Sequence, residues 1–131
     1  GKGGIGKSTV ALNLAQALSR LGEGVAVIGC SPKSSLWDFW GLSDKKTLLD
    51  LERYGGVSPA NINESTLVKE DGIIYAESGG PEPGVGCGGR GLQVALTRLS
   101  ENSDHVPGLK DVAYYIYDVI GDVVCGGFAM P

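Results

Sequence analysis

The sequence predicts an α/β fold, in which a mainly parallel sheet carries helices on both faces. Short apolar segments, typical of strands, alternate along the 131 residues with longer segments whose apolar residues recur at helical spacing. Glycine accounts for 22 of the 131 residues, more than twice the ~7% of an average protein. The glycines gather at residues 1–6, 79–91 and 121–127, which indicates special loops there. Strands that alternate with helices need right-handed crossovers, which place neighbouring strands parallel.

The first half of the chain predicts a helix, a strand and a shorter helix. The first helix is expected after residue 8, with Gly22 where a C-cap glycine belongs. Residues 25–28 predict an apolar strand, the stretch around Pro32 a loop, and residues 46–54 a helix that ends at Gly55. The expected core face of the first helix consists of Val10, Leu14, Ala17, Leu18 and Leu21.

The second half predicts two further strands and one helix. Residues 57–71 are polar and irregular, with room for one helical turn after Ser58-Pro59. Residues 72–76 predict a strand, and residues 77–91 a loop. Residues 112–117 predict the last strand, whose tyrosines at 114, 115 and 117 are expected to pack against helices. Between them, residues 91–100 predict a helix with one apolar face, formed by Leu92, Ala95, Leu96 and Leu99.

Composition and charge argue against several classes of function. A net charge of −4 and a pI near 4.9 disfavour general binding to nucleic acid or to an anionic membrane surface. The three cysteines, at positions 30, 87 and 125, are too widely spaced for the disulfide framework of a secreted domain. No apolar run approaches the ~18 residues that span a bilayer. We therefore expect a cytoplasmic protein with no nucleic-acid or membrane partner.

Residues 1–8 satisfy the pattern G-x-x-x-x-G-K-[ST] of a phosphate-binding loop. In such a loop, backbone N–H groups surround the phosphates at the positive end of the following helix. Lys7 would contact the β- and γ-phosphates, and the Ser8 hydroxyl would ligate Mg²⁺. A chance glycine-rich turn is the alternative, but an amphipathic helix is predicted where the motif requires one. The other loop residues expected at the nucleotide are Gly1, Gly3, Gly4, Ile5 and Gly6.

These features predict a fold of the P-loop NTPase type. Lys2 resembles the signature lysine of the deviant P-loop ATPases, in which this lysine reaches across a dimer to the partner's nucleotide; a solvated loop lysine is the alternative. Residue 1 already lies within the motif. We therefore expect residues 1–131 to form a single partial P-loop ATPase domain of this signature-lysine group, without its first strand and C-terminal part.

The end of the last predicted strand indicates a nucleotide sensor. Its apolar run ends in Asp118, as a buried strand does when its last residue must reach a magnesium ion. Gly121 follows where a backbone N–H would meet a terminal phosphate. An aspartate at a strand end often only caps a turn, but the P-loop favours the sensor. Cys125 lies in the same loop, at most about 25 Å of chain from Asp118, so a movement of Gly121 would also pull on Cys125.

Two cysteines share one small pattern, Cys-Gly-Gly, at Cys87 and at Cys125. Iron–sulfur clusters need thiolate ligands, and glycine allows backbone N–H groups to approach the cluster sulfides. Two thiolates make half of the usual set of four, which a symmetric dimer would complete. The alternative, a pair of buried free cysteines, stays open at this point because neither belongs to a C-x-x-C motif. Cys30 follows a strand and is expected to pack in the core.

Three segments together resemble the nitrogenase iron protein family, also called dinitrogenase reductase. They are residues 1–9, residues 77–91 (Glu-Ser-Gly-Gly-Pro-Glu-Pro-Gly-Val-Gly-Cys-Gly-Gly-Arg-Gly) and residues 118–131 (Asp-Val-Ile-Gly-Asp-Val-Val-Cys-Gly-Gly-Phe-Ala-Met-Pro). The likeness thus extends from the first residue to the last, with a looser middle. The related reductase of chlorophyllide synthesis has a similar outline without the Pro-Glu-Pro and Arg-Gly flanks.

The resemblance implies roles for individual residues. Cys87 and Cys125 would ligate one 4Fe–4S cluster shared across a homodimer. Asp118 and Asp122 would belong to the switch that couples the nucleotide to the cluster, with Lys2 as the third residue of the catalytic set. Arg90 would lie at the partner-docking face, where some members carry ADP-ribose; a surface arginine in an ion pair is the alternative. MgATP would be held by Lys2, Lys7, Ser8 and Thr9.

The activity implied is that of an ATP-dependent reductase in nitrogen fixation or a related pathway. The electron acceptor would be a nitrogenase-type catalytic protein, and the donor a low-potential ferredoxin or flavodoxin. A homologous partner that reduces a tetrapyrrole is a second possibility. A cluster-free regulatory ATPase of the partition type is a third, because Lys2 and the predicted fold suit it equally well.

One segment departs from the family pattern. After Cys30 the family would have Asp-Pro-Lys-Ala-Asp-Ser-Thr, whereas this chain has Ser-Pro-Lys-Ser-Ser-Leu-Trp. Both expected acidic positions are therefore serine, Ser31 and Ser35. A carboxylate organises a magnesium-bound water or accepts a proton, and a hydroxyl does neither well at neutral pH. The sequence thus predicts normal nucleotide binding with slow hydrolysis.

Overall fold

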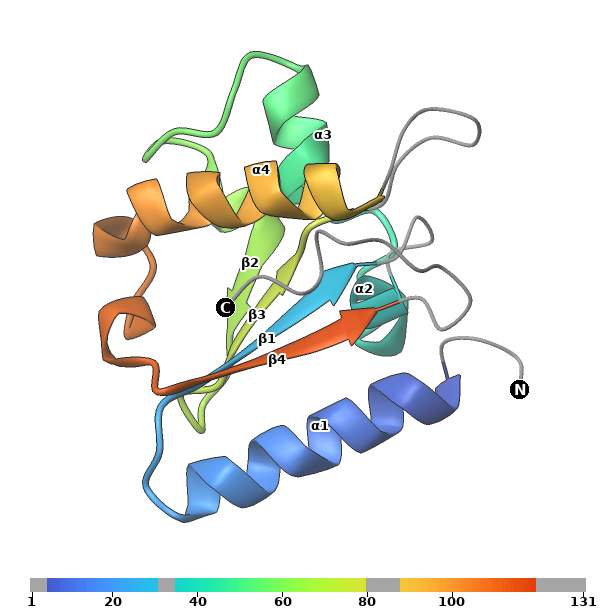
Figure 1. The fold of residues 1–131 in the computed structure, drawn as a ribbon, viewed down its shortest axis with the longest axis vertical. Coiled ribbons are helices and arrows are strands. Elements are labelled where there is room, and N and C mark those ends of the chain that lie inside the picture. The colour runs from blue at the N-terminus through green and yellow to red at the C-terminus, as the bar shows by residue number, and fades with distance from the viewer. Residues whose placement is uncertain (1–4, 31–34, 80–87, 120–131) are drawn as a thin grey trace.

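The computed structural model describes residues 5–30, 35–79 and 88–119. In these residues the strands form one sheet in the order β2-β3-β1-β4 (Figure 1). They are β1 (Val25–Cys30), β2 (Thr66–Val68), β3 (Ile74–Glu77) and β4 (Tyr114–Val119). β1 pairs in parallel with both β3 and β4, so the predicted mainly parallel sheet is confirmed.

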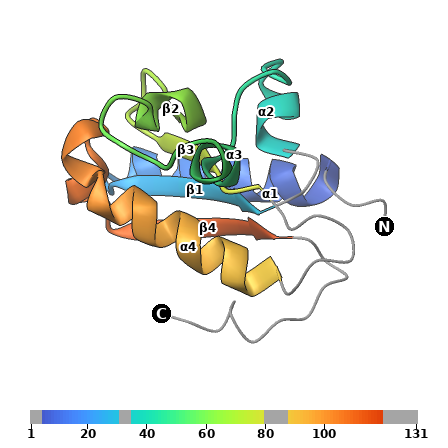
Figure 2. The same ribbon diagram turned by 90° about the horizontal axis from the view of Figure 1, so that it is seen from above.

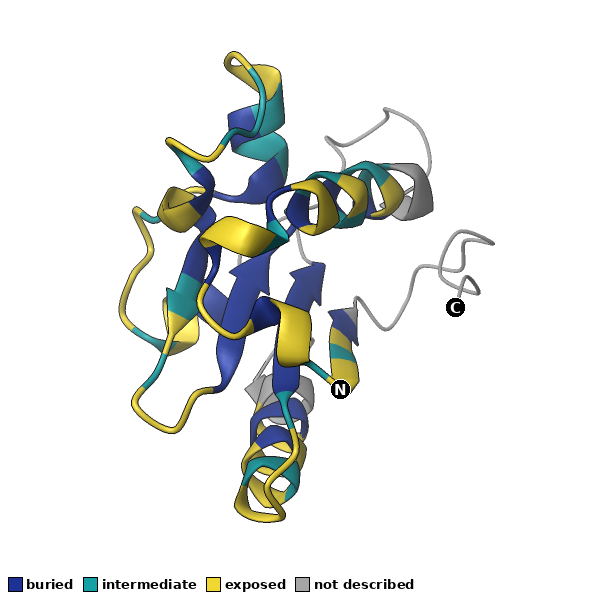
Figure 3. Ribbon diagram, turned by 90° about the vertical axis from the view of Figure 1, so that its left-hand side faces the viewer, coloured by how far each residue is buried: buried dark blue, intermediate teal, exposed yellow. Residues whose placement is uncertain are grey.

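Helices cover both faces of the sheet, as the sequence predicts. α1 (Ile5–Arg20) and α2 (Ser35–Phe39) pack on one face, and α3 (Leu48–Arg53) and α4 (Gly88–Glu101) on the other (Figures 1 and 2). Alternate residues of β1 supply the two cores: Val25 and Val27 face α1, whereas Ala26 and Ile28 face α4. β1 and β3 are therefore buried along their length (Figure 3).

α1 is present as predicted, but of its predicted core face only Leu18 packs against the core. Val10 and Leu21 are exposed, at 67% and 77%, whereas Ala11, Leu12 and Ala15 pack against the sheet. Small alanines let the helix lie close to the strands, and this neighbouring face of the same helix is also apolar. The helix ends as expected, because Gly22 adopts a φ of 86° and donates its N–H to Ser19 at 2.9 Å.

α2 forms where the sequence predicts a loop. Leu36 and Trp37 are fully buried, and the Trp37 indole donates to the Lys46 carbonyl at 2.9 Å. Trp40, just beyond the helix, packs edge-on against the Tyr75 ring at 5.3 Å, and the Lys69 ammonium lies 4.0 Å from its ring centre. Burial of these aromatic side chains against the sheet stabilises a helical turn that local sequence alone does not predict.

The segment expected to be irregular, residues 57–71, contains a strand that the sequence does not predict. A 3₁₀ turn (Ile62–Ser65), where one helical turn is allowed for, is followed by β2, which pairs antiparallel with β3. Ile62 and Ser65 of the turn are fully buried, so tertiary packing orders a stretch whose sequence is mostly polar. The helix predicted for residues 46–54 is confirmed as α3, which begins with a capping box formed by Thr47 and Asp50.

The second half otherwise follows the prediction, with one error. α4 begins at Gly88, and its apolar face buries Leu92, Ala95 and Leu99 as expected, with Leu96 packed beside them. The tyrosines of β4 do not pack fully against helices, since Tyr114, Tyr115 and Tyr117 are 42–46% exposed. β4 is the last strand in the described order, so no described strand pairs with its outer side.

Candidate functional site

The carboxyl ends of the three parallel strands meet at one edge of the sheet, and α1 begins at the same edge. In Figure 1 the arrowheads of β1 and β4 point toward the N-terminal end of α1. β3 lies parallel on the other side of β1 and ends at Glu77. Both views also place α2 beside the end of β1 (Figures 1 and 2). In open parallel sheets ligands bind outside the carboxyl ends of the strands, so we call this the nucleotide edge.

The phosphate-binding motif leads directly into α1. Gly1, Lys2, Gly3 and Gly4 lie outside the described residues, and the backbone of Ile5, Gly6, Lys7 and Ser8 forms the start of the helix. The first turn of α1 contains no acidic residue, so nothing there offsets the positive end of the helix dipole. Thr9 is exposed in the same helix. The helix that a P-loop requires is therefore present, in the expected place.

Asp118 lies at the nucleotide edge, on the side of the sheet that faces α1. It is buried, and β4 places it directly opposite Gly29 of β1. Ile116, two residues earlier on the same face of β4, packs against the core that contains α1. A carboxylate here lies on the same side as the helix that follows the phosphate loop. This position suits the magnesium role predicted from the sequence.

A second carboxylate at this edge was missed by sequence reasoning. Glu77 is fully buried, and the register places it opposite Gly29 on the other side from Asp118. Its Oε2 accepts a hydrogen bond from the Leu36 backbone N–H at 3.1 Å. Glu77 was grouped with the glycine-rich loop that it begins. The available signal was a charged residue directly after the apolar run at residues 73–76.

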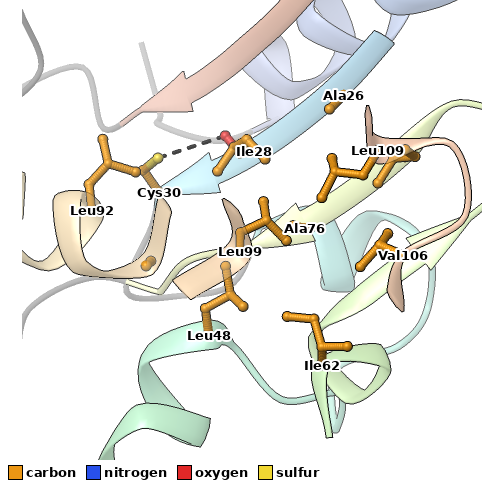
Figure 4. Close-up of a cluster of buried hydrophobic side chains, with 12 residues drawn as sticks. Ala26, Ile28, Cys30, Leu48, Ile62, Ala76, Leu92, Leu99, Val106 and Leu109 are labelled. Carbon is orange, nitrogen blue, oxygen red and sulfur yellow. Dashed lines mark hydrogen bonds between the residues drawn. The ribbon is translucent and has the colours of Figure 1, made fainter. Parts of the chain in front are cut away.

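Cys30 behaves as a core residue, as predicted. Its side chain lies on the α4 side of the sheet among Ile28 and Leu92, with the sulfur 3.7 Å from the Ile28 carbonyl oxygen (Figure 4). The pKa of the thiol is raised to about 12, mainly by burial. A hydrogen bond with Ser78 lowers it, and the nearby Glu77 and Asp118 carboxylates contribute to the rise. Metal ligation needs the thiolate, so Cys30 is unsuited to it.

The other predicted site residues fall outside the described part of the chain. These are Cys87, Gly121, Asp122 and Cys125, together with Ser31. Ser35 begins α2 and Arg90 lies in the first turn of α4, but only their backbone is described. Within residues 5–30, 35–79 and 88–119, no group of three or more His, Cys, Asp or Glu side chains is arranged to hold a metal ion.

A comparison with protein families shows which family the chain belongs to. The family model described as 4Fe-4S iron sulfur cluster binding proteins, NifH/frxC family, matches residues 1–131, the whole of this chain. The chain belongs to the NifH/frxC family. The resemblance to nitrogenase reductases is thereby confirmed, and with it a 4Fe–4S, ATP-dependent function of the reductase type.

Membership of this family bears on one of the alternative functions. The NifH/frxC family is defined by cluster binding, which disfavours the cluster-free regulatory ATPase. None of the helices described is both long enough and apolar enough to cross a membrane.

Proposed function

We propose that this NifH/frxC family member is the ATP-dependent reductase component of a nitrogenase or nitrogenase-like system. In this proposal it is a homodimer that carries one bridging 4Fe–4S cluster and passes single electrons to a catalytic protein. The observation that carries the proposal is the nucleotide edge. The chain segments that lead to Cys87 and to Cys125 leave the sheet there, from β3 and β4 on either side of β1.

The nucleotide would be held by residues at the start of α1 and at the end of β4. Lys7 would neutralise the β- and γ-phosphates, and the Ser8 hydroxyl and Asp118 would complete the shell of a magnesium ion. Thr9, the next residue of α1, would also contact the bound MgATP. Lys2 would reach the nucleotide of the partner subunit, so that ATP draws the two subunits together. Asp122 would belong to the switch that follows Asp118.

The cluster would be ligated by Cys87 and Cys125 of each subunit. When bound, it supplies a site that stores and releases one electron. Cys87 directly precedes α4, a helix of 14 residues, and the positive end of a helix favours the thiolate form that a ligand needs. Gly121 lies between Asp118 and Cys125 in the chain, so a change at the γ-phosphate would be transmitted to the cluster. Arg90, in the first turn of α4, would face the acceptor protein.

Cluster ligation is tested by spectroscopy on the full-length protein, prepared without oxygen. We expect broad absorbance near ~400 nm that is lost in Cys87→Ser and in Cys125→Ser. The matched control is Cys30→Ala, which removes the core cysteine and should keep the absorbance. A colourless, iron-free protein that chemical reconstitution cannot rescue would contradict the proposal.

The two serines bring a second class of electron acceptor into consideration. Ser31 and Ser35 stand where the nitrogenase iron protein pattern has aspartates, which points to a nitrogenase-like relative rather than a standard nitrogen fixer. A tetrapyrrole-reducing partner is therefore our second candidate. Electron transfer from the reduced protein to a purified nitrogenase catalytic protein, measured as acetylene reduction, separates the two: sustained turnover excludes the second candidate.

A further inference from the structure

Glu77 is a buried carboxylate that neither the P-loop nor the cluster motifs account for. No part of its side chain is exposed, although it ends a strand at the nucleotide edge. Burial of a carboxylate is costly unless hydrogen bonds compensate for the lost water. Its contacts therefore indicate why it is placed there.

One contact ties Glu77 to the start of α2. The Leu36 N–H that donates to Oε2 at 3.1 Å belongs to the first turn of the helix, where N–H groups have no partner within the helix. A carboxylate in this place is a charge-assisted acceptor, and it also interacts favourably with the helix dipole. The bond joins residues 41 apart in sequence, so it fixes α2 to the end of β3. Oε2 is thereby directed to α2.

Gly29 provides the space for this contact. A Cβ built on Gly29 would lie 2.4 Å from Oε2 and 2.7 Å from the carboxyl carbon of Glu77, closer than real atoms approach. The carboxylate therefore lies directly against the backbone of β1. Any side chain at position 29 would push it away from Leu36. The same glycine separates Glu77 from Asp118 in the sheet register.

The middle of α2 is held by separate contacts, so the hydrogen bond to Glu77 acts on the start of the helix. Trp37 is buried against the sheet and donates to the Lys46 carbonyl, which holds the body of the helix. β1 ends at Cys30 and α2 begins at Ser35, so Glu77 holds the first described turn of chain that follows β1.

We propose that Glu77 is a positioning residue for ATP hydrolysis, which holds the start of α2 at the nucleotide edge. The effect on hydrolysis rests on the proposed nucleotide site. The hydrogen bond to Leu36 does not, and it can be measured with no nucleotide present.

The first measurement is amide hydrogen exchange at Leu36 in the full-length protein. In Glu77→Ala and in Gly29→Ala we expect exchange about 10- to 100-fold faster than in the wild type, because a bond to a charged acceptor is lost. Glu77→Gln keeps the volume and one acceptor oxygen and should give a smaller increase. The double variant Gly29→Ala/Glu77→Ala should be no worse than Glu77→Ala, because the atom that clashes with the new Cβ is gone. The control, Glu52→Gln, changes a glutamate that pairs with Arg98 on the opposite face.

The second measurement is MgATP hydrolysis by the same variants, followed with radiolabelled ATP so that slow rates are captured. We expect kcat to fall at least about tenfold in Glu77→Ala and Gly29→Ala, with KM changed less than about twofold, since the P-loop is untouched. Melting curves identify variants that fail to fold. If Glu77→Ala or Gly29→Ala does not fold, the kcat of Glu77→Gln is compared with that of the wild type instead.

The outcomes separate this inference from the proposed function. Unchanged Leu36 exchange, or faster exchange with unchanged kcat, would overturn the positioning role and leave the reductase proposal intact. Faster exchange together with a fall in kcat supports it. Wild-type protein in which Leu36 is protected but MgATP is not bound would contradict the proposed function, while the hold of Glu77 on α2 would stand.

Discussion

Gly29 lacks a side chain at the point where both neighbouring strands carry a buried carboxylate. Asp118 and Glu77 lie opposite it on either side, and each has a different consequence. Asp118 faces the side of α1 and suits a magnesium shell, whereas Glu77 accepts the Leu36 N–H and fixes α2. In our proposals, Asp118 binds the magnesium ion and Glu77 positions the start of α2. Ser35, at the start of α2, occupies a position where the family pattern has an acid.

At the residue scale, restoring the acids should raise the rate of ATP hydrolysis. In Ser31→Asp/Ser35→Asp we expect kcat to rise about 10- to 100-fold, because a carboxylate can organise or deprotonate the attacking water. The KM for MgATP should change little, since the phosphate loop is intact. Steady-state phosphate release measures both constants. Ser43→Asp, which adds one such carboxylate in an exposed loop, is the control. An unchanged double variant would show that the serines do not limit the rate.

The elements differ in how far their own sequence specifies them. α3 begins with a capping box and α1 ends at a left-handed glycine, and both signals are local. α2 and β2 depend on partners far along the chain, since aromatic rings pack against β3 and backbone groups of β3 pair with β2. α3 and α4 are joined by an ion pair in which the Arg98 guanidinium lies 3.0 Å from the Glu52 carboxylate.

At the element scale, this ion pair should make stability depend on acid pH. The hydrogen bond from Arg98 is the main cause that lowers the pKa of Glu52 below 4.5. A carboxyl group whose pKa is lowered in the folded state stabilises the protein above its unfolded pKa and loses that contribution as pH falls through the folded pKa. Glu52→Gln should therefore reduce the loss of stability below about pH 4.5, by up to about 1 kcal/mol because the pair is partly exposed.

Urea unfolding at pH 7, 5, 4 and 3 measures this effect in wild type and variant. Glu64→Gln is the control, because its pair with Lys46 is largely exposed and water screens it. Equal acid sensitivity in the wild type and in Glu52→Gln would show that the α3–α4 pair does not contribute.

In the molecule as a whole, three parallel strands direct their carboxyl ends to the start of α1. The segments that carry the proposed phosphate sensor and the proposed cluster ligands all leave the sheet at this edge. The two proposed ligands, Cys87 and Cys125, make half of a four-thiolate set, so the proposed cluster site needs a second chain to complete it. The proposed function therefore requires a dimer whose geometry depends on the nucleotide.

At the scale of the molecule, Lys2 should couple ATP to dimer closure. In cluster-free protein, prepared with an iron chelator so that no cluster bridges the subunits, MgATP should favour the dimer. Lys2→Gln should weaken the MgATP-bound dimer at least about tenfold, because the partner's phosphates lose a cation in a desolvated interface. Sedimentation velocity with and without MgATP measures this. Lys110→Gln removes an exposed lysine paired with Asp104 and should behave as wild type; equal dimerisation of the Lys2 variant would contradict the role.

The α/β class, the parallel pairing and the P-loop helix could be predicted from the sequence, which also carries the Cys-Gly-Gly motifs behind the family resemblance. These features depend on local signals, because hydrophobic period, glycine positions and motif spacing act over a few residues. The buried face of α1, the helix at residues 35–39 and the contact of Glu77 with Gly29 became evident from the fold alone. Each of these depends on contacts between residues far apart in the chain, because burial of aromatic rings and of a carboxylate is favourable only when distant partners enclose them.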